Sequence, residues 1–350
     1  MPRELTLREA IVGARGSTEI IWKKLIDQRV RQYVDSIFPV EGIGKVIIDV
    51  AESEAGLPTV TMDESYSLDV SEDVINISSP SSWGACRAIT TLYQLQRTGG
   101  LVRSVSISDS PRFAWRGLLI DVARHFLPIA LLERVLDGMA LLKLNVLHIH
   151  LSDDQAFRFE SFVFPKLASE KHYSQSELTS LVAYAADRGI RVVAELDVPG
   201  HVTSWIVQYP EWGVSEVQTS KRFGVHRACL DPTSDGLYRD LALLFSEVAG
   251  VFPDEYLHIG GDEVHSDWWE SDDRLKAFSK ARGLSSVPEL QNFFSNKMHE
   301  ILTSLGKRAV AWDEVLHPAM SPYVIQNWRG ASTRDQALVR GFDCIFSSGF

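Results

Sequence analysis

The spacing of apolar residues changes near residue 110, and the two parts of the chain predict different architectures. In the first part, turn-forming residues separate short runs of alternating apolar and polar residues, a pattern typical of strands with one buried face. Strands are expected at 45–50, 66–70, 74–77 and 102–107, and helical spacing indicates helices at 19–38 and 81–96. Residues 1–110 are therefore expected to form a small α+β domain.

Beyond residue 110, short apolar runs alternate with longer segments in which apolar residues recur at helical spacing. Strands are expected at 117–122, 144–151, 190–198, 256–263, 309–312, 324–328 and 342–346, with helices at 128–142, 174–187, 235–249 and 288–305. Ser174 opens the second of these helices and Glu177 follows three residues later, which is a capping box. Repeated strand–helix units predict a parallel sheet covered by helices.

Polar or aromatic residues stand at or just after the end of one predicted strand after another. They are Asp121, Arg124, His150, Asp153, Asp197, His201, Asp262, Glu263, Trp312 and Trp328. A (β/α)8 barrel carries its active-site residues at the C-terminal ends of several strands, whereas an open doubly wound sheet gathers them at one switch point. We therefore expect an α/β fold in which residues 111–350 form a TIM barrel, with about seven strands present and truncation before strand eight.

Charge and composition exclude several classes of function. The chain has 35 Lys and Arg against 46 Asp and Glu, and a net charge of −11 argues against a nucleic-acid partner. Three isolated cysteines predict neither a disulfide framework nor a Cys-x-x-Cys metal site. No apolar run approaches membrane-spanning length, so no membrane partner is expected. The first residues show no secretory signal, which leaves the compartment open.

Two adjacent carboxylates, Asp262 and Glu263, follow an apolar run and the glycines Gly260 and Gly261. Glycine tolerates backbone conformations that other residues resist and leaves room for a close approach. Adjacent carboxylates in a partly desolvated cleft do not both ionise easily, so the pKa of one is expected to rise. An acid beside a carboxylate suits glycosidic or acyl chemistry, although a solvated turn would also place two carboxylates here.

Four segments carry a resemblance to glycoside hydrolase family 20, the β-N-acetylhexosaminidases. They are RGLLIDVARHF at 116–126, NVLHIHLSDDQ at 145–155, DVPGH at 197–201 and HIGGDEV at 258–264. The resemblance extends from about residue 110 to the end of the sequence. Residues 1–110 are also similar to the small α/β domain that precedes the barrel in this family, whose members are often lysosomal or secreted.

The resemblance implies hydrolysis of terminal, non-reducing N-acetylglucosamine or N-acetylgalactosamine residues from glycans, without a cofactor. The nucleophile would be the carbonyl oxygen of the substrate's own acetamido group, which forms an oxazolinium intermediate. Glu263 matches the general acid that protonates the leaving oxygen and later activates water. Asp262 matches the carboxylate that holds the acetamido N–H and stabilises the charge that develops there.

The resemblance also assigns six further residues to substrate binding. Arg124 matches an arginine that holds ring hydroxyls, although a salt bridge across the strand ends is the alternative. Asp153 and His201 match residues near the acid, with Asp197 expected to orient His201; turn chemistry is the alternative for the latter two. Trp312 and Trp328 match aromatic walls of the sugar site, although each alone would suit a core.

Two features leave other functions open. In the family, further substrate-binding residues and an eighth strand lie beyond the point where this sequence stops, so an incomplete enzyme that at most binds sugar is one alternative. A homo-oligomer that completes the site is another. His148 and His150 share one face of a strand, as in metal-dependent barrel hydrolases. We interpret His148 instead as a packed interior histidine and expect no metal site.

Overall fold

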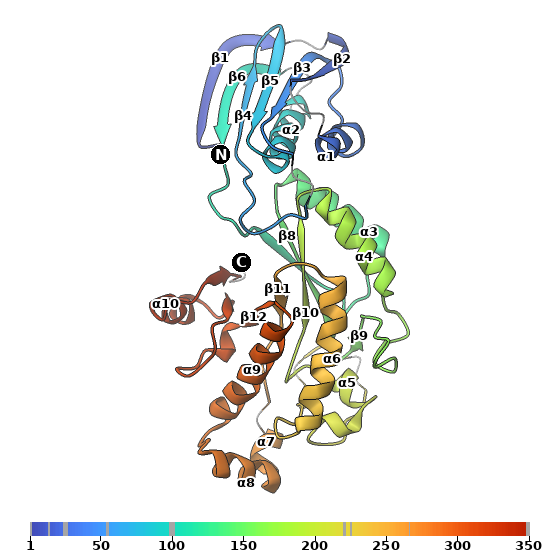
Figure 1. The fold of residues 1–350 in the computed structure, drawn as a ribbon, viewed down its shortest axis with the longest axis vertical. Coiled ribbons are helices and arrows are strands. Elements are labelled where there is room, and N and C mark those ends of the chain that lie inside the picture. The colour runs from blue at the N-terminus through green and yellow to red at the C-terminus, as the bar shows by residue number, and fades with distance from the viewer. Residues whose placement is uncertain are drawn as a thin grey trace. The chain divides into compact units, whose positions relative to one another are not determined.

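The computed structural model describes residues 2–347, apart from 13–14, 24–26, 54–55, 98–101, 220–221, 225 and 266. These residues fall into two compact units, which Figure 1 shows as a ribbon. The first unit contains the residues up to Leu118 together with Ala130–Val146 and Leu181–Arg191. The second contains Leu119–Ile129, Leu147–Ser180 and the residues from Val192 onward.

The first unit is built on a six-stranded mixed sheet with the order β1-β6-β4-β5-β3-β2. The strands are β1 (Glu4–Val12), β2 (Arg15–Trp22), β3 (Ile43–Val50), β4 (Tyr66–Val70), β5 (Val74–Ser79) and β6 (Val102–Asp109). Helix α2 (Ser82–Arg97) contacts β3, β4, β5 and β6, and its buried Ala85 and Ile89 belong to the same core as Ile48 and Leu68. The expected α+β layer is therefore present.

The prediction of one helix in the first unit is wrong for the first half of its range. The helix expected at 19–38 begins only at Gln28, as α1 (Gln28–Gln32) followed by the π-helical turn η1 (Tyr33–Ile37). Residues Ile20 and Ile21 lie instead in β2, opposite Val46 and Ile47 of β3. Isoleucine is β-branched and fits a paired strand well, so the partner strand outweighed the helical spacing.

The second sheet contains the seven predicted strands in barrel order, within the described residues. They are β7 (Gly117–Asp121), β8 (Val146–Asp153), β10 (Arg191–Leu196), β11 (Tyr256–His258), β12 (Arg308–Trp312), β13 (Val324–Asn327) and β14 (Cys344–Phe346). The sheet is a curled half-barrel of parallel strands, and the short β9 (Ala156–Phe157) pairs antiparallel with β8. The α/β barrel fold predicted from the sequence is confirmed.

The four helices expected between these strands are α3 (Ile129–Leu141), α4 (Gln175–Ala186), α6 (Asp235–Val251) and α9 (Val287–Ser304). The predicted capping box at α4 is present, because Glu177 N–H donates to Ser174 Oγ at 3.2 Å and Ser174 N–H donates to Glu177 Oε2 at 2.8 Å. None of the described helices combines the length and apolar character needed to cross a membrane.

Several short elements were not predicted. They are α5 (Thr203–Ile206), η2 (Pro210–Trp212), α7 (Asp267–Ser271), α8 (Asp273–Arg282), η3 (Asp313–Val315) and α10 (Ala331–Val339). Segments this short have little apolar periodicity of their own, and α8 and α10 bury one residue each. Most of them follow the C-terminal ends of strands, where the candidate site lies.

Candidate active site

The two adjacent carboxylates are placed by the glycines before them. Gly260 has a φ of +67° and Gly261 a φ of +95°, a region that favours glycine. A Cβ atom on Gly260 would lie 1.8 Å from Oδ1 of Asp197, so no other residue fits without displacing that side chain. Gly261 N–H donates to the same Asp197 oxygen at 2.9 Å. The loop after β11 is thereby fixed to the end of β10.

Asp262 and Glu263 both face the imidazole of His201. The Nε2 atom of His201 lies 3.5 Å from Glu263 Oε2 and 3.7 Å from Asp262 Oδ2. Exposure rises from the imidazole outward, from 1% for the His201 side chain to 19% for Asp262 and 37% for Glu263. His201 and Glu263 both have left-handed φ values, +56° and +46°, and such strain tends to gather at functional sites.

The other ring nitrogen of His201 contacts Asp153 rather than the expected Asp197. His201 Nδ1 lies 3.2 Å from Asp153 Oδ1, and Asp153 is fully buried. A carboxylate oxygen of Asp197 lies within 4.8 Å of an imidazole nitrogen of His201, so an orienting role for Asp197 stays a prediction. Although burial opposes protonation, Asp197 and then Asp153 raise the pKa of His201 to about 12. Burial, followed by the charge of Asp262, raises the pKa of Asp197 well above its ordinary value.

Arg124 lies at the end of β7 and links that strand to β8. Its guanidinium contacts Asp153 Oδ2 at 2.6 Å and Asp121 Oδ2 at 3.0 Å, while Nη1 lies 3.3 Å from His150 Nε2. The salt bridge considered as the alternative for Arg124 is thus present. It does not exclude a sugar contact, because a guanidinium has five N–H donors and this side chain is 23% exposed.

Each of the two predicted aromatic walls is held by a glutamate that the sequence analysis did not identify. Trp312 Nε1 donates to Glu195 Oε1 at 2.9 Å, and Trp328 Nε1 donates to both oxygens of Glu314 at 3.1 and 3.0 Å. Trp328 is 40% exposed, so it is not a core residue. A signal existed for Glu195, because it precedes Asp197 by two positions and alternate strand residues share a face.

Of these two glutamates, Glu314 has the pKa that lies near 7. Burial raises the pKa of its carboxyl to about 7, and the charge of Asp262 acts in the same direction. Hydrogen bonding from Trp328 and the charge of Arg329 oppose the rise but do not cancel it. Glu314 therefore changes charge close to the site in the range where enzymes commonly work.

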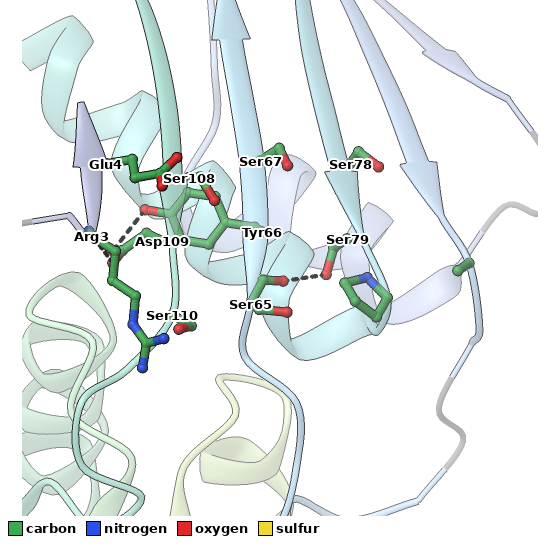
Figure 2. Close-up of a pocket in the computed structure, with 12 residues that line it drawn as sticks. Arg3, Glu4, Ser65, Tyr66, Ser67, Ser78, Ser79, Ser108, Asp109 and Ser110 are labelled. Atoms are coloured by element: carbon green, nitrogen blue, oxygen red, sulfur yellow. Dashed lines mark hydrogen bonds between the residues drawn. The ribbon is translucent and has the colours of Figure 1, made fainter. Parts of the chain in front are cut away.

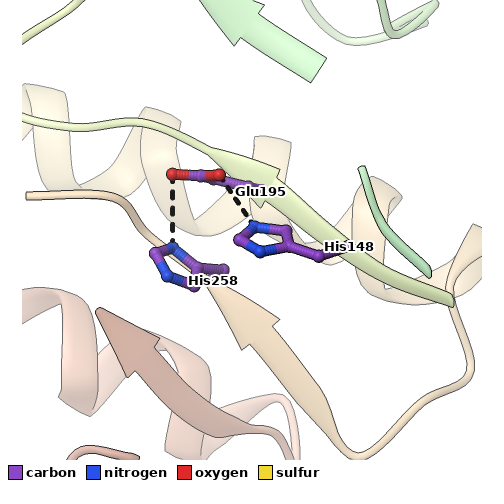
Figure 3. A group of neighbouring side chains, drawn as sticks. All are labelled: His148, Glu195 and His258. Atoms are coloured by element: carbon purple, nitrogen blue, oxygen red, sulfur yellow. Dashed lines mark ion pairs between the residues drawn. The ribbon is translucent and has the colours of Figure 1, made fainter. Parts of the chain in front are cut away.

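Glu195 also lies close to several buried histidines of the second sheet. Figure 3 shows His148 and His258 next to each other beneath its carboxylate, with His148 Nε2 2.8 Å from Oε2 and His258 Nδ1 3.3 Å from Oε1. His148 is only 3% exposed, which fits the expected packed interior histidine. The carboxylate beside these two imidazoles was not among the residues predicted from the sequence.

These three residues also bear on the metal-dependent alternative. His148, Glu195 and His258 each bring a ligand atom within 4.8 Å of the others, so a compact donor set does exist. However, Gly260 N–H donates to His258 Nδ1 at 2.9 Å, so the lone pair of that nitrogen is already used. The N–H of Trp312 likewise uses Oε1 of Glu195. His148 Nε2, His258 Nε2 and Glu195 Oε2 are buried without a hydrogen-bond partner among the described residues, so hydrogen bonding occupies only part of this donor set.

A second polar region lies in the first unit. Figure 2 shows a cavity of about 620 Å³ lined by Arg3, Glu4, Tyr66, Asp109 and several serines. Its lining residues include no histidine, so no serine there has an imidazole base to activate it. The Tyr66 hydroxyl is engaged by Asp109 and Thr91, and burial raises the pKa of Tyr66. The carboxylate–imidazole group of the second unit is therefore the stronger candidate for chemistry.

Comparison with family models gives two matches. A model described as "Glycosyl hydrolase family 20, catalytic domain" matches residues 113–350. A model described as "beta-acetyl hexosaminidase like" matches residues 17–95. The first match covers more than half of the chain and contains every candidate site residue described above.

Individual proteins give the same pattern. The chain is 38% identical over 328 residues to the mouse "Beta-hexosaminidase subunit beta", covering 87% of this chain and 60% of the relative. It is 34% identical over 333 residues to a "Beta-hexosaminidase" of Vibrio furnissii, covering 86% and 54%. The chain thus spans about three-fifths of the length of the curated relatives it matches, or less.

Solved structures agree with these matches. A chitobiase of Flavobacterium johnsoniae superimposes with a TM-score of 0.92 at 32% identity, covering 99% of this chain and 58% of that one. An exo-β-N-acetylglucosaminidase of Vibrio harveyi, solved with N-acetylglucosamine, gives a TM-score of 0.84 at 26% identity and covers 100% and 60%.

Proposed function

The chain belongs to glycosyl hydrolase family 20, and we propose that it removes terminal, non-reducing N-acetyl-β-hexosamine residues from glycans. The substrates would be glycans ending in N-acetylglucosamine or N-acetylgalactosamine. Hydrolysis would proceed with retention, through an oxazolinium intermediate that the substrate's own acetamido group forms.

In this mechanism the substrate's acetamido oxygen attacks the anomeric carbon while Glu263 donates a proton to the leaving glycosidic oxygen. Water, activated by the same Glu263, then opens the oxazolinium ring and restores the acetamido group. Asp262 accepts a hydrogen bond from the acetamido N–H and stabilises the positive charge that develops there. Arg124 binds ring hydroxyls, and Trp312 and Trp328 enclose the acetamido methyl and the sugar face.

One observation carries this proposal. Oδ1 of Asp262 and Nε2 of His201 are buried and have no hydrogen-bond partner among the described residues. Buried polar atoms normally have partners, so an unpartnered carboxylate oxygen indicates where a ligand donor belongs. An acetamido N–H on Asp262 would satisfy that oxygen and would leave Glu263, the more exposed carboxylate, facing the leaving group.

The proposal is tested by hydrolysis of a chromogenic β-N-acetylglucosaminide by the chain, beside Glu263→Gln and Asp262→Asn. Loss of the general acid is expected to lower kcat by roughly 10²- to 10⁴-fold. Asp262→Asn should lower kcat by roughly 10²- to 10³-fold, because it weakens stabilisation of the developing charge. A wild-type chain that melts cooperatively but hydrolyses no acetamido sugar would contradict the proposal and leave sugar binding as the alternative.

Two controls separate the mechanism from its alternatives. A β-glucoside without the acetamido group has no internal nucleophile, so any slow hydrolysis of it should be insensitive to Asp262→Asn. Equal losses on both substrates would refute substrate assistance. Incubation with a chelator should leave the rate unchanged, whereas loss of activity that zinc restores would favour the metal-dependent alternative at His148, Glu195 and His258.

A further inference from the structure

Glu195 lies near the end of β10, and its side chain is fully buried. Oε1 accepts one hydrogen bond, and two imidazole nitrogens lie close to Oε2 without hydrogen-bond geometry. Oε1 accepts from Trp312 Nε1 at 2.9 Å and lies 3.3 Å from His258 Nδ1. Oε2 lies 2.8 Å from His148 Nε2 and 2.9 Å from His150 Nδ1. One carboxylate thus accepts the indole N–H and lies within 3.3 Å of three imidazoles, and Figure 3 shows two of these contacts.

One of these contacts continues toward the two adjacent carboxylates. His150 Nε2 lies 2.9 Å from Asp153 Oδ2, and Asp153 Oδ1 lies 3.2 Å from His201 Nδ1. The remaining His201 nitrogen faces Asp262 and Glu263. A continuous series of polar contacts therefore connects Glu195 to the general acid proposed above.

The pKa shifts of His150 and Glu195 indicate that both side chains are charged. Although burial opposes protonation, the charge of Glu195 and the hydrogen bond to Asp153 raise the pKa of His150 well above its ordinary value. The pKa of Glu195 is correspondingly low, because its imidazole neighbours outweigh the effect of burial. His150 thus lies as an imidazolium between the two carboxylates, with Nε2 hydrogen-bonded to Asp153 Oδ2 and Nδ1 2.9 Å from Glu195 Oε2.

We propose that Glu195 is a positioning residue for the acetamido-sugar site, acting along two branches. Through the indole N–H it holds Trp312 against the sugar, and through His150 it holds Asp153 and His201 opposite Asp262 and Glu263. Glu195 itself lies too deep to touch substrate. This inference rests on the proposed function and extends it to a residue outside the site predicted from the sequence.

The test compares the wild-type chain with Glu195→Gln, which keeps the shape of the side chain and removes its charge. Loss of such a supporting contact is expected to lower kcat/KM by about 10- to 100-fold. The branch through Trp312 should raise KM, and the branch through His150 should lower kcat. Glu247→Gln is the matched control, because Glu247 holds a loop of the same unit through Ser161 and the Phe162 N–H. It should leave both constants within about twofold.

Double-mutant cycles separate positioning from general loss of structure. In a Trp312→Phe background the indole N–H is absent, so Glu195→Gln should add little to KM while still lowering kcat. Fully additive effects on KM would overturn the Trp312 branch. If Glu195→Gln does not fold, Trp312→Phe and His150→Gln each cut one branch. The proposal fails if both of these variants change the same kinetic constant to the same extent.

A readout that does not need turnover distinguishes failure of this inference from failure of the proposed function. The Trp312 indole N–H resonance in the NMR spectrum, assigned with Trp312→Phe, should move upfield in Glu195→Gln because its charged acceptor is lost. If the wild-type chain is inactive but the resonance moves in Glu195→Gln, the result would contradict the hydrolase function and would still support the contact between Glu195 and Trp312. An unmoved resonance, or kinetic constants within twofold of wild type in a folded Glu195→Gln chain, would overturn the inference.

Discussion

At the scale of single residues, the candidate site is a set of carboxyl groups whose surroundings give them different properties. Asp153 is buried against His150, His201 and Arg124, and hydrogen bonds from the two imidazoles lower its pKa despite burial. Glu314 is only partly buried and lies near Asp262, and its pKa rises. The same functional group therefore stays an anion at one position and changes charge near pH 7 at the other, according to its neighbours.

Glu314 makes stability depend on pH in a predictable direction. Its pKa in the folded chain is about 7 against an ordinary value of 4.5, so its contribution is fully present below about 4.5 and is lost as pH rises through 7. Glu314→Gln removes this loss, so the melting temperature of the variant relative to wild type should rise between pH 4.5 and 7. Glu300→Gln, an exposed carboxylate, is the control. A pH-independent difference would refute the shifted pKa.

At the scale of elements, the loop after β11 owes its shape to a steric requirement. Gly260 approaches the end of β10 so closely that a Cβ atom would meet Asp197 Oδ1 at 1.8 Å and the Asp197 Cα at 2.8 Å. Because the second of these atoms belongs to the backbone, a side-chain rotation alone does not relieve the clash. The loop that carries Asp262 and Glu263 therefore depends on glycine at this position.

Gly260→Ala is expected to destabilise the chain by about 1–3 kcal/mol, through the positive φ and the clash with Asp197. Gly250→Ala is the matched control, because it lies in α6 with no atom within 4 Å of an added Cβ. That change should be neutral or stabilise by up to about 1 kcal/mol, since alanine is the better helix former. Denaturant unfolding measures both changes. Equal effects would show that the close approach at Gly260 is unimportant.

At the scale of the whole molecule, buried ion pairs join segments that are far apart in the sequence. Within the first unit, Glu64 Oε1 lies 2.7 Å from Arg87 Nε and 2.7 Å from Arg116 Nη2. Arg87 also donates to the backbone carbonyls of Arg188 and Gly189, about a hundred residues away. These guanidinium groups thus connect α2, the segment before β7 and the segment before β10.

Glu64→Ala is expected to cost about 3–5 kcal/mol, because it leaves Arg87 buried without its carboxylate. The pKa of Glu64 lies below its ordinary value, since Arg87 and Arg116 outweigh burial. Its stabilising contribution is therefore present above pH 4.5 and is lost as pH falls, so the variant should approach wild type in acid. Unfolding at pH 7 and at pH 3 measures the difference.

Asp335→Ala is the control for this prediction. It breaks an exposed pair and should cost less than about 1 kcal/mol.

The family and the order of the barrel strands could be predicted from the sequence, because short segments contain both the motifs and the apolar runs on which these predictions rest. A buried strand needs an apolar run, and the residues after it show what the C-terminal edge of the sheet carries. The seven strands of the second sheet and the helices between them follow this rule. The helix expected at 19–38 did not form over residues 19–22, because these residues pair with β3 and local spacing does not contain that pairing.

The fold, the family and most of the residues at the strand ends could be predicted from the amino-acid sequence. The contacts between these residues became visible only in the folded structure. Asp153 rather than Asp197 bonds to His201, and Glu195 and Glu314 hold the two tryptophans. The reason is physical: burial and hydrogen bonding act over a few ångströms in space, and Glu195 and Trp312 are 117 positions apart in the chain.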